Sequence, residues 1–420
     1  MSDHHYLKAI TDLSDSHKIV AACDIYSQNG IKLVAAGIQI NSRIYERLVQ
    51  HKLLHSLDKA LSMENVLNSE MILADVIKLT ELNESLKLAA DILRQRDSYN
   101  KIIESIKLPK PLAFKLTVEK EKFPHIYQRS LLIILISVYI AHCEEMSFEE
   151  KRLMATAALF HDIGLLHIDP KLLEPTHVMT TSERRHLYTH PITSYMILCE
   201  FPEIPTLIAN AVLEHHERMD GKGYPRRMQG KKISRYGQIL GISELISKVF
   251  DSNKDKVSWA KLKIMLKMNS KQYGVGLIGY LNIFHDQAAV GQSGYVESAH
   301  VIDQLRLIAK LFSDFNGLSD QQSSNPNYQF AQNRLTELRM ALFSAGLDPH
   351  DPESMSQMFI DDPDCIAEFA PIIDETIWQF KALLLEVSRQ WPETNELTNE
   401  VMNNQDNSWF GQMNLVLITG

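Results

Sequence analysis

Two short clusters of histidine and carboxylate side chains dominate the middle of the chain. His161 and Asp162 form one adjacent pair, and His215 and His216 form a second pair about fifty positions later. Neutral imidazole is the commonest metal ligand in proteins, and an aspartate can bridge two ions. A lone histidine is more often structural, but nine of the seventeen histidines fall between His125 and His216. This concentration predicts a site for divalent metal ions.

The adjacency of His215 and His216 indicates how many ions to expect. Consecutive helical residues point about 100° apart, so two adjacent imidazoles rarely serve one metal from one helix face. They can serve two neighbouring metals. We therefore expect a multinuclear site rather than a single zinc.

A glycine-containing loop follows the second histidine pair. Gly221 and Gly223 flank Lys222, and glycine allows close backbone approach and unusual φ values. A phosphate can be accommodated there, with Arg226 and Arg227 nearby. A turn that carries solvated bases is the alternative interpretation of these residues.

The segments that position these residues have helical periodicity from about Lys115 to Phe315. The His161–Asp162 pair ends an apolar helix over 154–160, and the glycine at 164 indicates a turn soon after it. The longest apolar stretch, 131–141, is about a dozen residues long, which is too short to span a bilayer and suits a buried helix.

The first hundred residues predict a small α+β module. Asn29-Gly30 between the β-prone runs 19–26 and 31–36 is a strong hairpin signal. A helix capped by Asn41 or Ser42 and continuing through Leu57 should follow, with more helix to about 106. The chain then breaks at two prolines, 109 and 111, where we expect a domain boundary. A polar stretch, 318–328, indicates a linker before amphipathic helices over 330–343 and 372–387.

Composition excludes several classes of protein. The 420 residues are 45% hydrophobic and 23% charged, which is typical of a soluble protein. The net charge of -9 argues against binding of long nucleic acids, although 218–235 carries a local +6 and 351–400 a local -10. The first residues are polar and do not resemble a signal peptide. The four widely spaced cysteines are expected to be buried in a reducing cytoplasm.

The two clusters together resemble a known family. His161-Asp162-Ile163-Gly164, with His215-His216-Glu217-Arg218-Met219-Asp220-Gly221-Lys222-Gly223-Tyr224-Pro225, is similar to the HD-GYP domain. That domain is a subclass of the all-helical HD phosphohydrolases and hydrolyses bacterial cyclic dinucleotides. The resemblance covers roughly 121–250. It implies a mainly α fold with an HD-type helical core, which we place over 112–316. From their position on either side of this core, 1–108 is expected to be an N-terminal regulatory or dimerisation module and 329–420 a C-terminal helical region.

The resemblance also implies ligands by position. His125 lies 36 residues before His161, His190 lies 29 residues after it, and Glu244 follows His216 by 28. Members with three metals add a glutamate four residues before the first histidine, where Glu121 stands. The implied metal ligands are Glu121, His125, His161, Asp162, His190, His215, His216 and Glu244. His161 and Asp162 are also the implied catalytic residues, and Arg218, Lys222, Tyr224 and Arg226 are candidates for substrate binding. For Tyr224 a role in shaping the loop is at least as plausible.

Three positions depart from the family pattern. Leu165 stands where the family usually has a lysine that helps hold the substrate phosphate. Glu244 replaces an aspartate and lengthens the ligand arm by one methylene, and Ser247 occupies the position of a second aspartate. These departures put phosphate binding and metal occupancy in question.

The function implied by the resemblance is hydrolysis of cyclic di-GMP or 3'3'-cyclic GMP-AMP to the linear dinucleotide. Hydroxide activated by two or three divalent ions would attack phosphorus, and a ligand set without thiolates favours iron or manganese over zinc. The alternative is a weak or inactive binding module that acts through protein partners, for example by docking a diguanylate-cyclase-type protein through the loop. A phosphohydrolase of ordinary nucleotides is a third reading. Homodimerisation and an absence of membrane association are further expectations.

Overall fold

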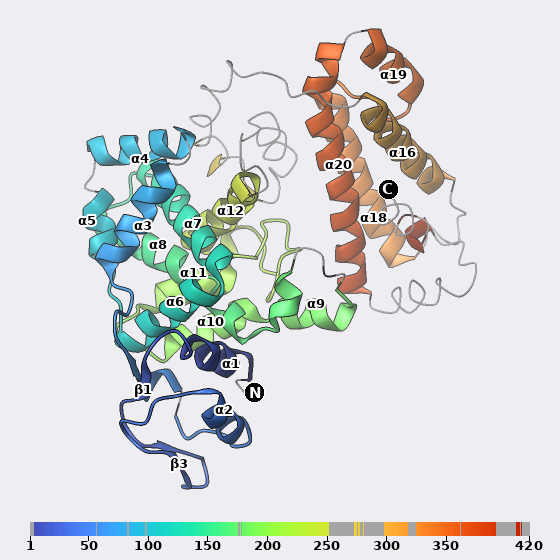
Figure 1. Cartoon of the computed structure of the whole chain (residues 1–420). Helices are drawn as coiled ribbons and strands as arrows, with labels where there is room; N and C mark the ends of the chain where they lie inside the picture. Colours follow the sequence, from blue (N-terminus) through green and yellow to red (C-terminus); the bar gives the residue numbers. More distant parts are fainter. Residues whose placement is uncertain are drawn as a thin grey trace. The chain divides into compact units, whose positions relative to one another are not determined.

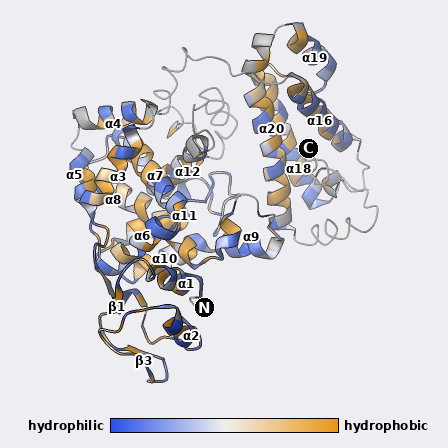
Figure 2. Ribbon diagram, in the orientation of Figure 1, coloured by the Kyte–Doolittle hydropathy of each residue, from blue (hydrophilic) through white to orange (hydrophobic). Residues whose placement is uncertain are grey.

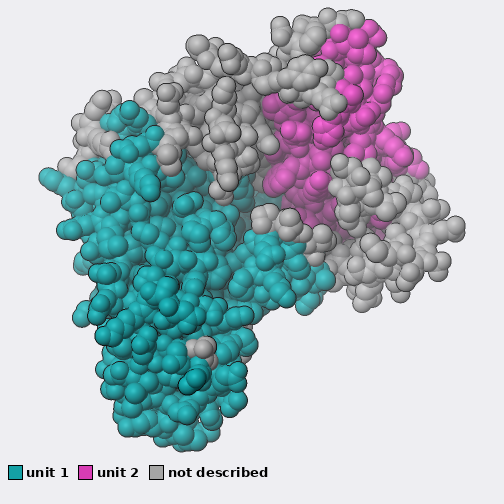
Figure 3. All heavy atoms as spheres, in the orientation of Figure 1, with its two compact units in different colours: residues 1–254, 272–283 teal, residues 255–271, 284–420 magenta. Residues whose placement is uncertain are grey.

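The structure is a computed structural model of the chain (Figure 1). It describes residues 4–55, 57–81, 84–96, 99–174, 177, 179–251, 273–274, 276–277, 280, 298–317, 325–361, 363–391, 409–411 and 413. Two compact units divide the chain, one of residues 1–254 and 272–283 and one of residues 255–271 and 284–420 (Figure 3). Each unit is considered by itself below.

The first unit begins with the small α+β region that the sequence predicts. Its elements are α1 (His4–Leu13), β1 (Ile19–Ala21), β2 (Ile25–Tyr26), β3 (Lys32–Val34), α2 (Ser42–Val49), η1 (Leu57–Lys59) and β4 (Leu61–Met63). The expected hairpin is confirmed, because β2 pairs antiparallel with β3 across Asn29 and Gly30. Gly30 adopts a φ of 77°, which glycine reaches without steric cost. β1 pairs instead with β4, in register Ile19 to Met63.

The helix after the hairpin is shorter than predicted. Asn41 caps it, since its side chain accepts hydrogen bonds from the backbone amides of Arg43 and Ile44. The helix ends at Val49 and does not continue to Leu57. The next residues pair with the hairpin instead, because the amide of Leu54 donates to the carbonyl of Tyr26 at 2.9 Å. This long-range contact overrides the local periodicity.

Helices make up the rest of the described first unit. The first group is α3 (Ser69–Glu81), α4 (Glu84–Arg96), α5 (Tyr99–Glu104), α6 (Lys110–Lys122), α7 (Pro124–Cys143) and α8 (Phe148–Phe160). The second group is η2 (Ile163–His167), η3 (Pro170–Leu173), α9 (Thr181–Leu187), α10 (His190–Cys199), α11 (Thr206–Glu214), η4 (Gly230–Lys232) and α12 (Arg235–Asp251). The mainly α fold class is confirmed.

The central helix of this unit is α7, which packs against α6, α8 and α12 as well as α3 and α4. It is long and apolar enough to cross a membrane by length and composition, yet 78% of its most apolar window is buried inside the protein. Hydrophobic residues run along α7 and the neighbouring α8 (Figure 2). The apolar stretch 131–141 is therefore a core helix, as the sequence predicts.

Two cysteines are more exposed than predicted. Cys23 and Cys199 are exposed, and Cys143 is half-buried. Cys23 lies in the bend between β1 and β2, and Cys199 is the last residue of α10. Both stand where the chain turns at the surface. The side chain of Cys365 lies outside the described residues.

The second unit is helical where it is described. It contains α16 (Ser298–Asn316), α18 (Pro326–Ser344), α19 (Pro352–Asp361) and α20 (Pro363–Gln390). An apolar core joins these helices and includes Leu305, Phe359 and Phe380, each with no exposed surface. The helices expected over 330–343 and 372–387 lie within α18 and α20. Of the expected linker, 318–324 lies outside the described residues, and Pro326 begins α18.

The domain boundaries at 108–112 and 316–329 remain a prediction. The compact units divide the chain at other positions, since 1–108 and the HD segment share the first unit and α16 belongs to the second. Helices α3, α4 and α5 pack against α7 and α8 across the two prolines. A functional division at those prolines would therefore separate elements that share one core.

Candidate metal centre

The histidine and carboxylate side chains converge from the ends of several helices. His161 follows the last residue of α8, and Asp162 precedes η2. His190 begins α10, His215 follows the end of α11, and Glu244 lies within α12. Helix ends at one place allow side chains from distant parts of the sequence to meet.

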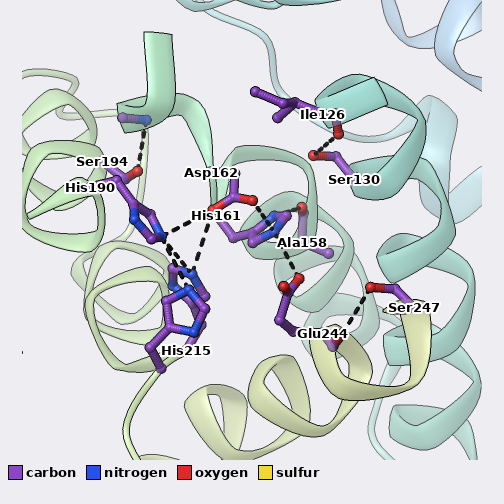
Figure 4. Close-up of polar contacts among 12 residues, drawn as sticks. Ile126, Ser130, Ala158, His161, Asp162, His190, Ser194, His215, Glu244 and Ser247 are labelled. Atoms are coloured by element: carbon purple, nitrogen blue, oxygen red, sulfur yellow. Dashed lines mark hydrogen bonds and ion pairs between the residues drawn. The ribbon is translucent and has the colours of Figure 1, made fainter. Parts of the chain in front are cut away.

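Asp162 lies between two groups of ligand atoms, as Figure 4 shows. Its Oδ1 is 3.2 Å from His190 Nε2 and 3.6 Å from His215 Nε2. His216 Nε2 lies 3.2 Å from His190 Nε2. We call the first group, Asp162, His190, His215 and His216, the histidine-rich subsite; its ligand atoms all lie within 4.8 Å of one another.

The other oxygen of Asp162 faces a second group. Asp162 Oδ2 is 3.1 Å from His161 Nε2, which lies 3.6 Å from Glu244 Oε2. We call His161, Asp162 and Glu244 the oxygen-rich subsite. Its ligand atoms also all lie within 4.8 Å of one another. One carboxylate thus contributes to both subsites, which is the geometry of a bridging ligand.

Three imidazoles are oriented by the same kind of hydrogen bond to a backbone carbonyl. The Nδ1 atoms of His161, His190 and His215 each donate to a carbonyl oxygen three residues earlier, at 2.8, 2.7 and 2.5 Å. A donor hydrogen on Nδ1 leaves Nε2 with its lone pair directed at the site when the ring is neutral. Such hydrogen bonds hold the tautomer and ring orientation of metal-binding histidines.

The pKa values of several side chains in the metal-free centre are strongly shifted. Burial lowers the pKa of His215 and, with neighbouring His215 and His190, lowers that of His216 well below its usual range. Burial would also lower the pKa of His161, but Asp162 and Glu244 raise it to about 10. Burial would raise the pKa of Glu244, but Lys248 and His161 lower it to about 2. Without metal, a protonated His161 therefore provides the positive charge between two carboxylates.

The residues present fit divalent metal ions. His161 Nε2, Asp162 Oδ1 and Glu244 Oε2 are buried and make no hydrogen bond with any residue that the structure describes, despite their short separations. Buried polar atoms are normally satisfied, so several such atoms at one point indicate an ion or water. Imidazole and carboxylate without thiolate suit iron, manganese and similar divalent ions.

His215 and His216 are arranged differently from what their spacing on a helix predicts. His215 and His216 both belong to the histidine-rich subsite, although two neighbouring metals were expected to separate them. α11 ends at Glu214, and His215 at its C-cap keeps a helical backbone, with φ -64° and ψ -18°. Both rings nevertheless contribute to the same subsite.

Two predicted ligands lie elsewhere. Glu121 and His125 are exposed, and neither belongs to the groups of ligand atoms found among the described residues. Sequence reasoning missed Glu119, which is 1% exposed, near the end of the same helix α6. Its neighbours in sequence, Thr117 and Val118, are also buried, so amphipathic periodicity alone did not distinguish it.

The carboxylates of Glu217 and Glu214 bind the loop that follows the two histidines. Glu217 accepts hydrogen bonds from the amides of Arg226 and Met228 at 2.6 and 2.8 Å. The Arg226 guanidinium also donates to Glu214 at 2.9 Å. Arg226 is thus engaged by the protein, although its side chain remains 45% exposed.

The other loop candidates for substrate binding are partly engaged as well. The Arg218 guanidinium pairs with Asp220 at 2.7 Å, and the backbone amide of Lys222 donates to the same carboxylate. Both Arg218 and Lys222 are half-buried. The local charge of +6 read from the sequence is therefore partly neutralised within the fold.

Tyr224 forms part of an aromatic row. Its ring stacks on His216 with centroids 4.6 Å apart and on Tyr188 with centroids 4.3 Å apart. Both pairs have an interplanar angle of 25°. With a ring on each face, Tyr224 is placed to support His216 more than to stack on a nucleobase.

The structure shows where the three residues that depart from the family pattern lie. Leu165 is buried within η2, where its side chain is 5% exposed. Ser247 is fully buried, and its hydroxyl donates to the backbone carbonyl of Glu244 at 2.9 Å. Glu244 itself belongs to the oxygen-rich subsite. The longer carboxylate arm therefore still reaches the site.

Comparisons with known proteins agree with this centre. Residues 117–276 match the family model described as HD domain. The cyclic di-GMP phosphodiesterase response regulator RpfG of Xanthomonas campestris pv. campestris is 30% identical over 118 residues, which are 27% of this chain and 30% of that protein. The cyclic di-GMP phosphodiesterase PA4108 of Pseudomonas aeruginosa is 22% identical over 43% of this chain and 44% of its own length.

A relative named for another substrate is equally similar. The 3'3'-cGAMP-specific phosphodiesterase 3 of Vibrio cholerae serotype O1 is 29% identical over 30% of this chain and 27% of that protein. The chain spans less than half the length of each of these relatives. Residues 117–276 thus match an HD domain, and its histidine–carboxylate centre could hold divalent metal ions. With its His161–Asp162 pair and its 215–225 motif, this part of the chain is similar to the HD-GYP phosphodiesterases named above.

Proposed function

We propose that the protein is a metal-dependent phosphodiesterase that hydrolyses a bacterial cyclic dinucleotide to its linear form. The observation that carries this proposal is the bridging position of Asp162 between two groups of ligand atoms. Relatives named as cyclic di-GMP and 3'3'-cGAMP phosphodiesterases support the substrate class. Cyclic di-GMP and 3'3'-cyclic GMP-AMP are therefore the two substrates to compare.

The residues of the centre have distinct roles in this reaction. Bound divalent ions supply hydroxide near neutral pH, because they lower the pKa of water from about 15.7 to about 7 in favourable cases. Asp162 would contribute one carboxylate oxygen to each subsite, with His161 next to Oδ2 and His190 next to Oδ1. In this proposal Lys222 of the loop would neutralise charge on the substrate phosphate.

Iron or manganese is the proposed metal, at two or three ions per chain. The ligand atoms are nitrogen and oxygen only, which favours these ions over structural zinc. Two subsites are formed by the described residues. Because Glu121 and His125 are exposed, a third ion would need ligands beyond the two groups.

A weak or inactive binding module remains the second candidate. The observation that favours it is Leu165, a buried apolar side chain where the family has a phosphate-binding lysine. In this role the exposed Arg226 and Arg227 would form the surface that docks a diguanylate-cyclase-type partner. A cytoplasmic location and a homodimer formed through 1–108 complete the proposal.

The test is a turnover assay combined with metal analysis. The protein is purified without oxygen, its metals are counted, and the products from each cyclic dinucleotide are separated with Mn²⁺ or Fe²⁺ added. We expect linear dinucleotide from at least one substrate. If two metals are bound and neither substrate is cleaved, the phosphodiesterase proposal fails and the binding module takes its place.

A substitution links the activity to the centre. Asp162→Ala should remove metal and turnover together, because both subsites lose their shared carboxylate. Glu203→Gln, an exposed carboxylate on the same unit, is the matched control and should leave both unchanged. Full turnover by Asp162→Ala with metal still bound would exclude this site as the catalytic centre.

A further inference from the structure

Helix α20 of the second unit has exposed apolar side chains on the side that faces away from its core. α20 packs against α16, α18 and α19 (Figure 1), and its residues Ile373 and Phe380 are fully buried in that core. On the outward side, 45% of Trp378 and 38% of Leu385 are exposed. Single exposed apolar residues are common on protein surfaces, so the residues around these two decide whether the face has a role.

The exposed residues of α20 recur at the spacing of one helix face. Two apolar and two charged side chains are separated by four, three and four positions, and such spacing places them on one side of a helix. They are Asp374, Trp378, Lys381 and Leu385, all exposed. Pro371, which is half-buried, precedes Asp374 by three positions. We call the four exposed residues the outer face of α20.

The outer face is complementary to itself when the helix direction is reversed. If a second copy of α20 lies antiparallel with Trp378 against Trp378, Leu385 comes opposite Pro371, since each lies seven positions from the tryptophan. Asp374, four positions before it, comes next to Lys381, three positions after it. A parallel pair would instead place each charge opposite its own copy, and like charges across a contact are unfavourable.

We propose that the outer face of α20 is a contact between two copies of this chain, which pair antiparallel about a two-fold axis at Trp378. In such a contact each copy supplies the same surface, so a self-complementary pattern is what it requires. Two ion pairs between Asp374 and Lys381 flank the indole rings. The proposal goes beyond the proposed function, because it uses only the second unit and is separate from the homodimer proposed through 1–108.

The small size of the outer face determines how tightly two copies should bind. Interfaces that bury less than about 1,200 Å² are typical of weak and transient complexes, and one helix face per copy belongs to that class. Tryptophan is enriched among the residues that carry most of the binding energy of an interface, whereas exposed ion pairs mainly fix orientation. We therefore expect association at micromolar concentrations, with an affinity that depends chiefly on Trp378.

The experiment is sedimentation velocity of the whole chain at concentrations from about 1 to about 200 µM, a range that covers micromolar dissociation constants. Wild type should show an association step as its concentration rises. Trp378→Ser should weaken that step by about tenfold or more. Phe343→Ser is the matched control, because Phe343 is an aromatic residue with 49% exposure on α18, and it should associate as wild type does.

An exchange of the two charges tests the direction of the paired helices. Lys381→Glu places two carboxylates together in the antiparallel pair, and Asp374→Lys places two ammonium groups together, so each should weaken association. The double variant, Asp374→Lys with Lys381→Glu, restores opposite charges and should recover most of the wild-type affinity. In a parallel pair every one of these proteins would oppose like charges, so neither the losses nor the recovery would occur.

Several outcomes would overturn the proposal. They are a wild type that shows no association step over this range, a Trp378→Ser protein that associates as wild type does, an equal loss in Phe343→Ser, and a double variant as weak as the single ones. Unchanged association in Trp378→Ser is the result expected if the chain pairs only through 1–108. Circular dichroism reports that each variant is folded. Because no metal or substrate is needed, the result is independent of the phosphodiesterase function.

Discussion

At the scale of single residues, the fold opposes or supports the ionisation of several buried carboxyl groups. Glu119 is the clearest case, because its pKa rises from 4.5 to about 8 through burial and the nearby charge of Asp162. A carboxyl group with a raised pKa is stable in the fold when it is protonated. Its contribution to stability is therefore fully present below about 4.5 and is lost as the pH rises through about 8.

The corresponding prediction concerns the metal-free protein. As the pH rises from about 4.5 to about 8, wild type should lose stability relative to Glu119→Gln, in which the group cannot ionise. Thermal unfolding of both proteins over this pH range, with a chelator present, measures the difference. Parallel curves for the two proteins would mean that Glu119 ionises as easily in the fold as in the unfolded chain.

Tyr224 affects the centre through its ring rather than its hydroxyl. Because it stacks on His216, its removal should loosen that ligand. We expect Tyr224→Ala to weaken metal binding by about 10- to 100-fold, the range typical of residues that support metal ligands. Tyr224→Phe keeps the stacked ring and should bind metal as wild type does. Equal affinities in the alanine and phenylalanine variants would show that the stack does not position His216.

At the scale of elements, apolar periodicity predicted helices well but not where helices end. The helix that begins at Ser42 ends at Val49 because the residues after it pair with the strand at Tyr26, a partner that local spacing does not reveal. His215 and His216 directly follow the end of α11 at Glu214 and belong to one subsite, which helical spacing did not predict. Ends of helices depend on tertiary contacts, and this centre is built from such ends.

The ligand set shows the same limit. The resemblance pointed to His161, Asp162, His190 and Glu244, and the structure brings their ligand atoms together. The ligands expected on the preceding helices, Glu121 and His125, are exposed, and the buried carboxyl group is Glu119. Spacing alone did not establish which side of α6 faces the interior, since every residue from Leu112 to Glu119 is buried.

Gly164 sets the distance between η2 and α10. A Cβ atom at this position would lie 2.4 Å from the carbonyl oxygen of His190 and 2.8 Å from the amide nitrogen of Ser194. Both are backbone atoms, so relief requires a movement of α10 itself. The close approach also allows the Gly164 amide to donate to the Ser194 hydroxyl at 2.8 Å.

Gly164→Ala should therefore destabilise the protein by about 1–3 kcal/mol, the usual cost of overpacking. It should also weaken metal binding at the histidine-rich subsite, because His190 begins the displaced helix. Chemical unfolding and a metal titration measure the two effects. Gly276→Ala is the control, since its added Cβ would meet no atom within 4 Å. A stable Gly164→Ala protein with normal metal affinity would contradict this account of η2.

At the scale of the whole molecule, the question is whether 1–108 behaves as a separate module. Within the first unit, the buried Lys115 joins segments from both sides of the predicted boundary. Its Nζ lies 2.7 Å from Asp58 Oδ2, donates to His167 Nε2 at 3.4 Å and lies 3.8 Å from the centre of the Tyr6 ring. The Tyr6 hydroxyl also donates to Asp58. His167 ends η2, five residues after Asp162, so these contacts join the N-terminal segments to the 3-10 helix that follows the metal centre in the chain.

This network predicts cooperative unfolding of the first unit. Lys115→Met leaves the Asp58 carboxylate buried without its cation, and breaking a buried ion pair in this way costs about 3–5 kcal/mol. The added substitution Asp58→Asn removes the orphaned charge and should recover part of that loss. Calorimetry should show that Lys115→Met lowers the unfolding temperature of 1–108 and of the metal centre in a single transition, followed by metal release. Two separate transitions, with the N-terminal segments melting first while metal remains bound, would instead support a boundary at the two prolines.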